Sequence, residues 1–132
     1  MILVDSSALV EYYRPNGIPE VQAAVTEAIE ADAAAVNGII QVEVLGFASG
    51  RDSFDDLLHD FKVFHRIALQ EIDFDQATEM GFSLRRRGVT VPATDLIIAA
   101  SAIRAGAILY HKDGHYDALS RYYALKAKNL QP

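Results

Sequence analysis

The chain of 132 residues begins with Met1-Ile2-Leu3-Val4-Asp5, a continuous apolar run that ends in an acid. A short apolar run rich in branched residues is typical of a strand buried on both faces of a parallel sheet. In open parallel sheets the functional crevice lies outside the carboxyl ends of the strands. We therefore expect Asp5 to lie at the functional edge of the molecule.

Strand patterns and helix patterns alternate along the rest of the chain. Further strands are expected at Ala33–Val36, Ile67–Ile72, Ala107–Tyr110 and Ala124–Leu130. Helices are expected at Ala8–Tyr13, Ile18–Ile29, Ile39–Ala48, Phe54–Phe64, Asp73–Gly88, Asp95–Arg104 and Tyr116–Tyr123. This alternation predicts right-handed βαβ crossovers and a three-layer α/β/α fold, with a central parallel sheet of roughly four to five strands. We expect one domain over residues 1–132.

Polar residues at three expected helix starts indicate caps. Ser6 precedes the first helix, and Thr94 precedes the apolar helix that begins at Asp95. Asp73 and Gln76 have the spacing of a capping box. The helix after Thr94 is apolar nearly all round, so we expect it to be buried.

The composition excludes several classes of protein. The chain has no cysteine, which rules out a disulfide framework, a zinc-thiolate site and a cysteine nucleophile. The first residues lack the basic and long apolar regions of a secretory signal. The apolar run Leu96–Ile103 is too short to cross a bilayer. We expect a cytoplasmic protein with no membrane contact.

The net charge is −6, which taken alone argues against binding to nucleic acid. Proteins that bind nucleic acid usually present a basic face or stripe. The objection weakens if several of the acids face a bound cation, because that cation would offset their charge.

Four acids occupy positions where ordinary solvated acids are not expected. Asp5 and Asp113 follow predicted buried strands at their carboxyl ends. Glu43 interrupts an apolar helix face that includes Phe47, and Asp95 lies in the first turn of the most apolar helix. Each ionised carboxylate in an apolar setting costs several kcal/mol unless it is paired, and neighbouring carboxylates also repel one another. Their joint occurrence indicates a compensating positive charge.

A divalent cation is the simplest compensation, because Lys112 is the only basic residue in the same local segments. Oxygen ligands favour a hard ion, Mg²⁺ or Mn²⁺, over zinc. No histidine stands at a spacing that indicates a ligand pair, so surface or packing roles are expected for His59, His65, His111 and His115. A contact with substrate stays open for His115, which lies beside Asp113.

Two of these acids also have simpler interpretations. Asp95 is an acid in a helix first turn, which the helix dipole favours, and Asp5 is able to cap the following helix. Glu43 is harder to explain in this way, because a position within a helix offers no free backbone donor.

Four stretches in order resemble the PIN domain, and within that family the VapC-type toxins of toxin–antitoxin pairs. They span essentially the whole chain: Ile2-Leu-Val-Asp-Ser-Ser-Ala-Leu-Val10, Val42-Glu-Val-Leu-Gly46, Ala93-Thr-Asp-Leu-Ile-Ile-Ala-Ala100 and Lys112-Asp-Gly-His-Tyr116. The resemblance implies a parallel sheet flanked by helices, in agreement with the pattern of elements.

By this resemblance the acidic quartet is Asp5, Glu43, Asp95 and Asp113. The metal would be held by Asp5, Asp95 and Asp113, with supporting hydroxyls from Ser6, Ser7 and Thr94. The fourth motif departs from the family pattern, because His111 and Tyr116 stand where the family usually has threonine or serine and phenylalanine. A second acid, Asp117, lies one helical turn after Asp113, so either is a candidate for the metal site; Asp113 is favoured.

The implied activity is magnesium-dependent hydrolysis of RNA, in which a metal-activated water attacks the phosphodiester. Glu43 or Asp113 would orient or deprotonate that water. The candidate contacts to the RNA backbone are Arg85, Arg86, Arg87 and Lys112. The arginine run also has a simpler interpretation, an interaction with the carboxyl end of its own helix.

For a toxin the resemblance implies a homodimer and a cognate antitoxin that inserts a segment into the active-site groove. The alternatives are a housekeeping PIN nuclease without an antitoxin and an inactive PIN-fold binding module. A receiver-type signalling module, also a small α/β domain, fits poorly, because Asp5 stands alone after the first strand and Glu43 is on a helix.

Overall fold

The structure is a computed structural model that describes all 132 residues. Five parallel strands form one sheet in the order β3-β2-β1-β4-β5. Their bounds are β1 (Ile2–Val4), β2 (Ala34–Val36), β3 (His65–Arg66), β4 (Ile108–His111) and β5 (Ala127–Asn129). The expected parallel sheet is confirmed at the upper limit of the predicted strand number.

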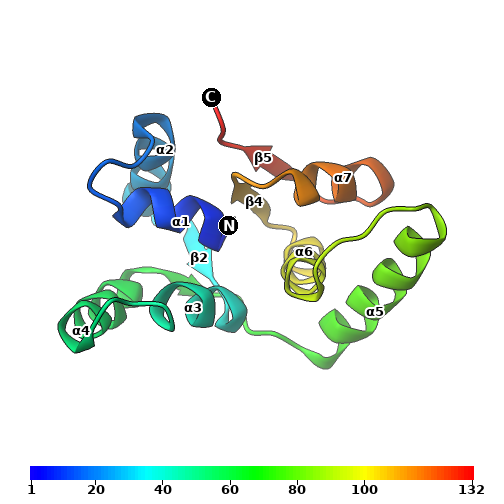
Figure 1. Ribbon diagram of the computed structural model, residues 1–132, viewed down its shortest axis with the longest axis horizontal. Coiled ribbons are helices and arrows are strands. Elements are labelled where there is room, and N and C mark those ends of the chain that lie inside the picture. The colour runs from blue at the N-terminus through cyan, green and yellow to red at the C-terminus, as the bar shows by residue number, and fades with distance from the viewer.

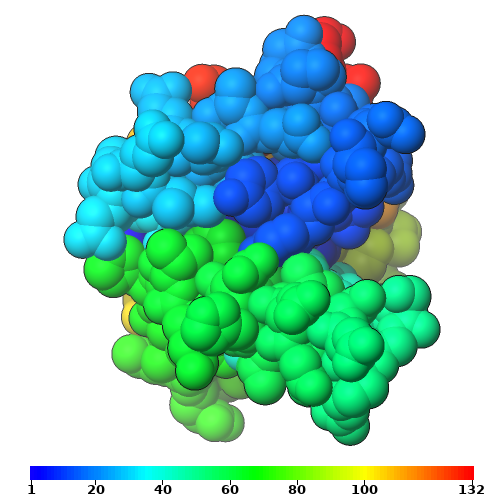
Figure 2. Space-filling view, turned by 90° about the vertical axis from the view of Figure 1, so that its left-hand side faces the viewer, coloured from blue at the N-terminus to red at the C-terminus, as the bar shows by residue number.

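Helices cover both faces of this sheet. They are α1 (Ser6–Tyr13), α2 (Pro19–Glu30), α3 (Gly38–Leu45), α4 (Arg51–Asp60), the 3₁₀ turn Phe61–Val63, α5 (Glu71–Arg86), α6 (Ala93–Ala105) and α7 (Gly114–Tyr122). In Figure 1, α1, α2 and α4 lie on one side of the strands and α5, α6 and α7 on the other. Figure 2 faces the first of these sides, where the dark blue α1 lies between α2 and the green segments after α3. The predicted three-layer architecture is therefore confirmed.

The central strand β1 brings the functional residues to one edge. Leu3 and Val4 are completely buried, as expected for a strand covered on both faces. Val4 lies opposite Tyr110 of β4, and the Asp5 backbone N–H donates to the Tyr110 carbonyl at 2.9 Å. The carboxyl ends of β1 and β4 are thus aligned, and the residues that follow them emerge side by side.

The predicted strand Ile67–Ile72 is wrong. Strand β3 ends at Arg66, and α5 already begins at Glu71. The capping box consists of Gln70 as the cap and Asp73 three residues later, not of Asp73 and Gln76. Because this cap starts the helix early, Ile72 lies in its first turn and is half exposed.

Two predicted helix caps are also wrong. Asp5, not Ser6, caps α1, because its carboxylate accepts from the Ser7 N–H at 3.0 Å. Pro92 occupies the cap position of α6, while Thr94 lies exposed within the first turn and makes no capping hydrogen bond. Proline is compatible with this position because helix starts need no backbone donor there.

Helix α6 is the buried helix that its composition predicts. Seven of its thirteen residues are buried, and it packs against α5 across much of its length. It ends at Gly106, which has a left-handed φ of 65° that a residue with a side chain rarely adopts. No helix of the chain combines the length and apolar character that a membrane span requires.

Candidate active site

Asp5 is the most firmly held acid of the site. It follows β1 directly and is only 3% exposed. One carboxylate oxygen, Oδ2, accepts from the Ser7 backbone N–H at 3.0 Å and from the Ser7 hydroxyl at 2.6 Å. The other, Oδ1, accepts from the Tyr116 hydroxyl at 2.8 Å. Three donors therefore fix the orientation of this side chain.

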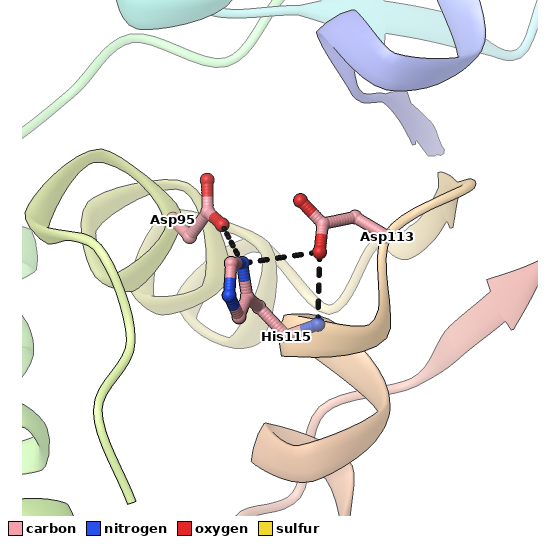
Figure 3. A group of neighbouring side chains, drawn as sticks. All are labelled: Asp95, Asp113 and His115. Atoms are coloured by element: carbon pink, nitrogen blue, oxygen red, sulfur yellow. Dashed lines mark hydrogen bonds and ion pairs between the residues drawn. The ribbon is translucent and has the colours of Figure 1, made fainter.

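Asp95, Asp113 and His115 meet where α6 begins near the start of α7 (Figure 3). The His115 Nδ1 lies 3.0 Å from Asp95 Oδ2 and 3.1 Å from Asp113 Oδ1. Asp113 also caps α7, accepting from the His115 backbone N–H at 2.9 Å. The potential ligand atoms of the three residues all lie within 4.8 Å of one another. Residues from two distant segments thus form one polar cluster.

Glu43 reaches the same region from α3. Its Oε1 accepts from the Ser6 hydroxyl at 3.1 Å, which joins α3 to the start of α1. Buried Asn37 caps the start of α3, because its side chain accepts from the Ile40 N–H at 3.0 Å. The same side chain donates to the Ser101 hydroxyl of α6 at 3.3 Å and so ties α3 to α6.

The predicted apolar face around Glu43 is wrong in one respect. Phe47 is 84% exposed, so it does not bury the acid. Val42, the residue before Glu43, is also exposed, at 65%. Glu43 is partly buried because it faces α1, and not because its own helix surrounds it with apolar side chains.

The acids repel one another, and two of their pKa values show this. Burial raises the pKa of Asp95, and the charges of Asp113 and Asp5 raise it further, although His115 partly opposes them. Burial also raises the pKa of Glu43, and the charges of Asp5, Asp95 and Asp113 add to this effect against the hydrogen bond from Ser6. All four acids of the predicted quartet therefore share one electrostatic environment.

The donor set of this cluster fits a divalent cation. Carboxylate oxygens are the usual ligands of hard ions, and one imidazole nitrogen is compatible with several divalent metals. Asp113 Oδ2 and Glu43 Oε2 accept no hydrogen bond from the protein and so remain free to bind a cation. A cation would also offset the repulsion that raises the pKa values of Asp95 and Glu43.

Comparison with known proteins identifies the family of the chain. The sequence profile of the PIN domain matches residues 2–122. The chain belongs to the PIN-domain family. This PIN domain is 34% identical over 136 aligned positions to ribonuclease VapC11 of Mycobacterium tuberculosis, and the match covers 99% of the chain and 100% of the relative.

Solved structures share the fold of this PIN domain. FitAcB from Neisseria gonorrhoeae has a TM-score of 0.80 at 18% identity, and the match covers 98% of both chains. A toxin–antitoxin complex from Klebsiella pneumoniae has a TM-score of 0.76 at 16% identity, covering 99% of this chain and 98% of the other. At these identities the likeness concerns the fold alone.

Two predicted residues of the PIN domain lie away from the acid cluster or are already paired. Asp117 accepts from Asn129 at 2.9 Å and lies 3.6 Å from the His111 ring nitrogen. Lys112 donates to Glu11 at 3.2 Å, so its ammonium is paired within the protein. Of the two late acids, only Asp113 shares the cluster with Asp95.

The arginine run lies exposed at the carboxyl end of α5 and in the residue that follows. The Arg86 guanidinium stacks over the Phe82 ring at 4.2 Å, and that of Arg87 over the Tyr122 ring at 5.0 Å. Arg87 therefore lies against the last residue of α7, the helix that begins beside Asp113. Arg85 lines a groove between α5 and α6.

Sequence reasoning missed two residues of the cluster. A surface or packing role was expected for His115, whereas its ring lies between Asp95 and Asp113. Tyr116 is completely buried, and its hydroxyl lies 2.8 Å from Asp5 and 3.4 Å from Asp95. The departure of Tyr116 from the family's usual phenylalanine was the available signal, since it places a hydroxyl where an apolar ring is normal.

Proposed function

We propose that this PIN domain, over residues 1–132, is a magnesium-dependent endoribonuclease and the toxin of a VapBC-type toxin–antitoxin pair. The convergence of Asp5, Glu43, Asp95 and Asp113 from four separate segments carries this proposal. The full-length similarity to a VapC ribonuclease supports the RNA substrate.

The metal would be held by Asp5, Asp95 and Asp113. We favour Mg²⁺, with Mn²⁺ as an alternative, because carboxylate oxygens dominate the cluster. When bound, such a cation supplies charge stabilisation at the scissile phosphate and activation of a water.

The chain's own residues would position that water and accept its proton. Glu43 is the best candidate proton acceptor, because burial raises its pKa and so makes its carboxylate a stronger base. Ser6 holds one Glu43 oxygen and leaves the other free to contact water. Ser7 and Thr94 are the remaining candidate hydroxyls; Ser7 supports Asp5 directly.

RNA would approach across the exposed arginines between the groove of α5 and α6 and the carboxyl end of α7. Arg85, Arg86 and Arg87 are exposed, and Arg87 is held against α7 by Tyr122. Arginine stacked on an aromatic ring suits both phosphate contact and base stacking. Lys112 is a weaker candidate, since Glu11 already neutralises it.

A protein partner is part of this proposal. Val42 and Phe47 are exposed apolar residues on either side of Glu43, where an inserted antitoxin segment would cover them. The resemblance to VapC-type toxins and the full-length similarity to a VapC ribonuclease support a cognate antitoxin here. We also propose a homodimer and a cytoplasmic location.

The test is cleavage of RNA by the purified protein in Mg²⁺ and in EDTA. We expect metal-dependent cleavage, and loss of at least about 100-fold in Asp5→Asn or Asp95→Asn, since even residues that only support a metal ligand are worth roughly 10- to 100-fold. Asp117→Asn is the matched control, because it makes the same chemical change outside the cluster and should retain activity.

Cleavage that persists in EDTA, or full activity in Asp5→Asn, would refute the assignment. An adjacent gene for a small DNA-binding protein that inhibits cleavage would support the toxin role. Activity without such a gene would favour a housekeeping nuclease, and a folded protein that cuts no RNA would favour an inactive binding module.

A further inference from the structure

Tyr116 is the one side chain that contacts two acids of the quartet from inside the protein. It lies in the first turn of α7 and has no exposed surface. Its ring packs edge-on against His111 with ring centroids 5.0 Å apart. The hydroxyl is therefore held in place by packing, and its position does not depend on solvent or on a flexible chain.

The hydroxyl faces the carboxylates of Asp5 and Asp95 together. It donates to Asp5 Oδ1 at 2.8 Å and lies 3.4 Å from Asp95 Oδ1. A tyrosine hydroxyl has a single proton, so Asp5 receives the stronger bond and Asp95 the weaker one. Without the hydroxyl, Asp5 Oδ1 and Asp95 Oδ1 would lose the donor that they share.

Removing the Tyr116 hydroxyl would leave the Asp95 side chain less firmly held than that of Asp5. Asp5 keeps two donors from Ser7, whereas Asp95 keeps only His115, whose side chain is 45% exposed. The distance between Asp5 and Asp95 therefore depends on Tyr116.

We propose that Tyr116 is a positioning residue that holds Asp5 and Asp95 at the separation a divalent cation needs. This inference rests on the proposed metal-dependent function and adds a residue to it. Hydrogen-bond donors that orient ligating carboxylates contribute to metal affinity although they do not touch the metal. A phenylalanine at this position would fill the same space without that contact.

The experiment compares Mn²⁺ binding by the wild type, Tyr116→Phe and Tyr13→Phe, measured by isothermal titration calorimetry. We expect Tyr116→Phe to weaken binding about 10-fold. Tyr13→Phe is the matched control, because Tyr13 is a partly buried residue whose hydroxyl makes no hydrogen bond within the protein. Its affinity should equal that of the wild type.

A second measurement separates a loss of metal affinity from a loss of fold stability in Tyr116→Phe. Chemical unfolding in EDTA and in saturating Mn²⁺ yields the stabilisation by metal, which linkage relates to the affinity. A Tyr116→Phe protein that loses stability in EDTA but binds Mn²⁺ like the wild type would overturn the positioning role. Absence of Mn²⁺ binding in the wild type would instead overturn the proposed function itself.

Discussion

A buried aspartate lies at each end of helix α6, one paired with an arginine and the other surrounded by acids. Near its carboxyl end, Arg104 forms a two-pronged ion pair with Asp73 of α5, at 2.7 and 3.0 Å. At its amino end, Asp95 faces Asp5 and Asp113 with only His115 and Tyr116 as donors. Asp73 is 1% exposed and Asp95 is 9% exposed, so both are buried.

The pKa values separate these two regions. The hydrogen bonds that Arg104 donates to Asp73 raise the pKa of Arg104, so the carboxylate stabilises the guanidinium charge. Burial and like charges raise the pKa of Asp95, so its ionised form is held at a cost. At the carboxyl end of α6 the ion pair is complete within the protein, whereas at the amino end the proposed cation would compensate the acids.

The largest expected effect comes from removing the ion pair between Arg104 and Asp73. Arg104→Ala leaves Asp73 buried and uncompensated, which should cost about 3 kcal/mol of unfolding free energy, the lower end of the usual range because Arg104 is 27% exposed. Urea unfolding measures this loss. Metal affinity should stay within a factor of about two, and a larger change would show that the two ends of α6 are coupled.

A third buried acid offers an intermediate case. Glu11 is 4% exposed and pairs with Lys112 and Arg14. Burial raises the pKa of Glu11, but Lys112, the Ile18 N–H and Arg14 outweigh it and hold the pKa below 4.5. Glu11 therefore stabilises the fold above pH 4.5, and this contribution is lost as the pH falls through the folded-state value.

We expect Glu11→Gln to lower the Tm by several degrees at neutral pH. The difference from the wild type should shrink in acid, where Glu11 is protonated in both the folded and unfolded states. Thermal unfolding from neutral to acidic pH checks this. A difference that is constant across the pH range would mean that the charge of Glu11 is not the cause.

The smallest expected effect has the opposite sign and concerns Glu43. Its folded-state pKa lies above 4.5, so its contribution to stability is present below pH 4.5 and is lost as the pH rises through the folded-state value. Glu43→Gln removes this loss and should raise the Tm of the metal-free protein at neutral pH by at most a few degrees.

Thermal unfolding in EDTA measures the Glu43→Gln effect, and the difference should disappear below pH 4.5. The same variant should lose RNA cleavage, since the amide does not accept a proton from water. A variant that is less stable than the wild type at neutral pH would show that Glu43 is not repelled by its neighbours.

Much of the site was predictable from the sequence. Asp5 directly follows the apolar run of β1, Asp113 comes two residues after β4, and both residues lie at the expected edge. The role of His115 was not predictable in this way, because it depends on how α7 lies against α6. The start of α5 was missed, because Gln70 competes with Asp73 as a cap and only the packed structure selects one.

The sequence by itself determined the alternation of strands and helices and the acids at the strand ends. These features follow from local hydrophobic patterns, which depend on neighbours a few residues apart. Only the tertiary structure decided that the Tyr116 hydroxyl joins Asp5 to Asp95, across 111 and 21 residues of chain. Such contacts depend on strand register, helix placement and side-chain rotamers together, and no local pattern encodes all three.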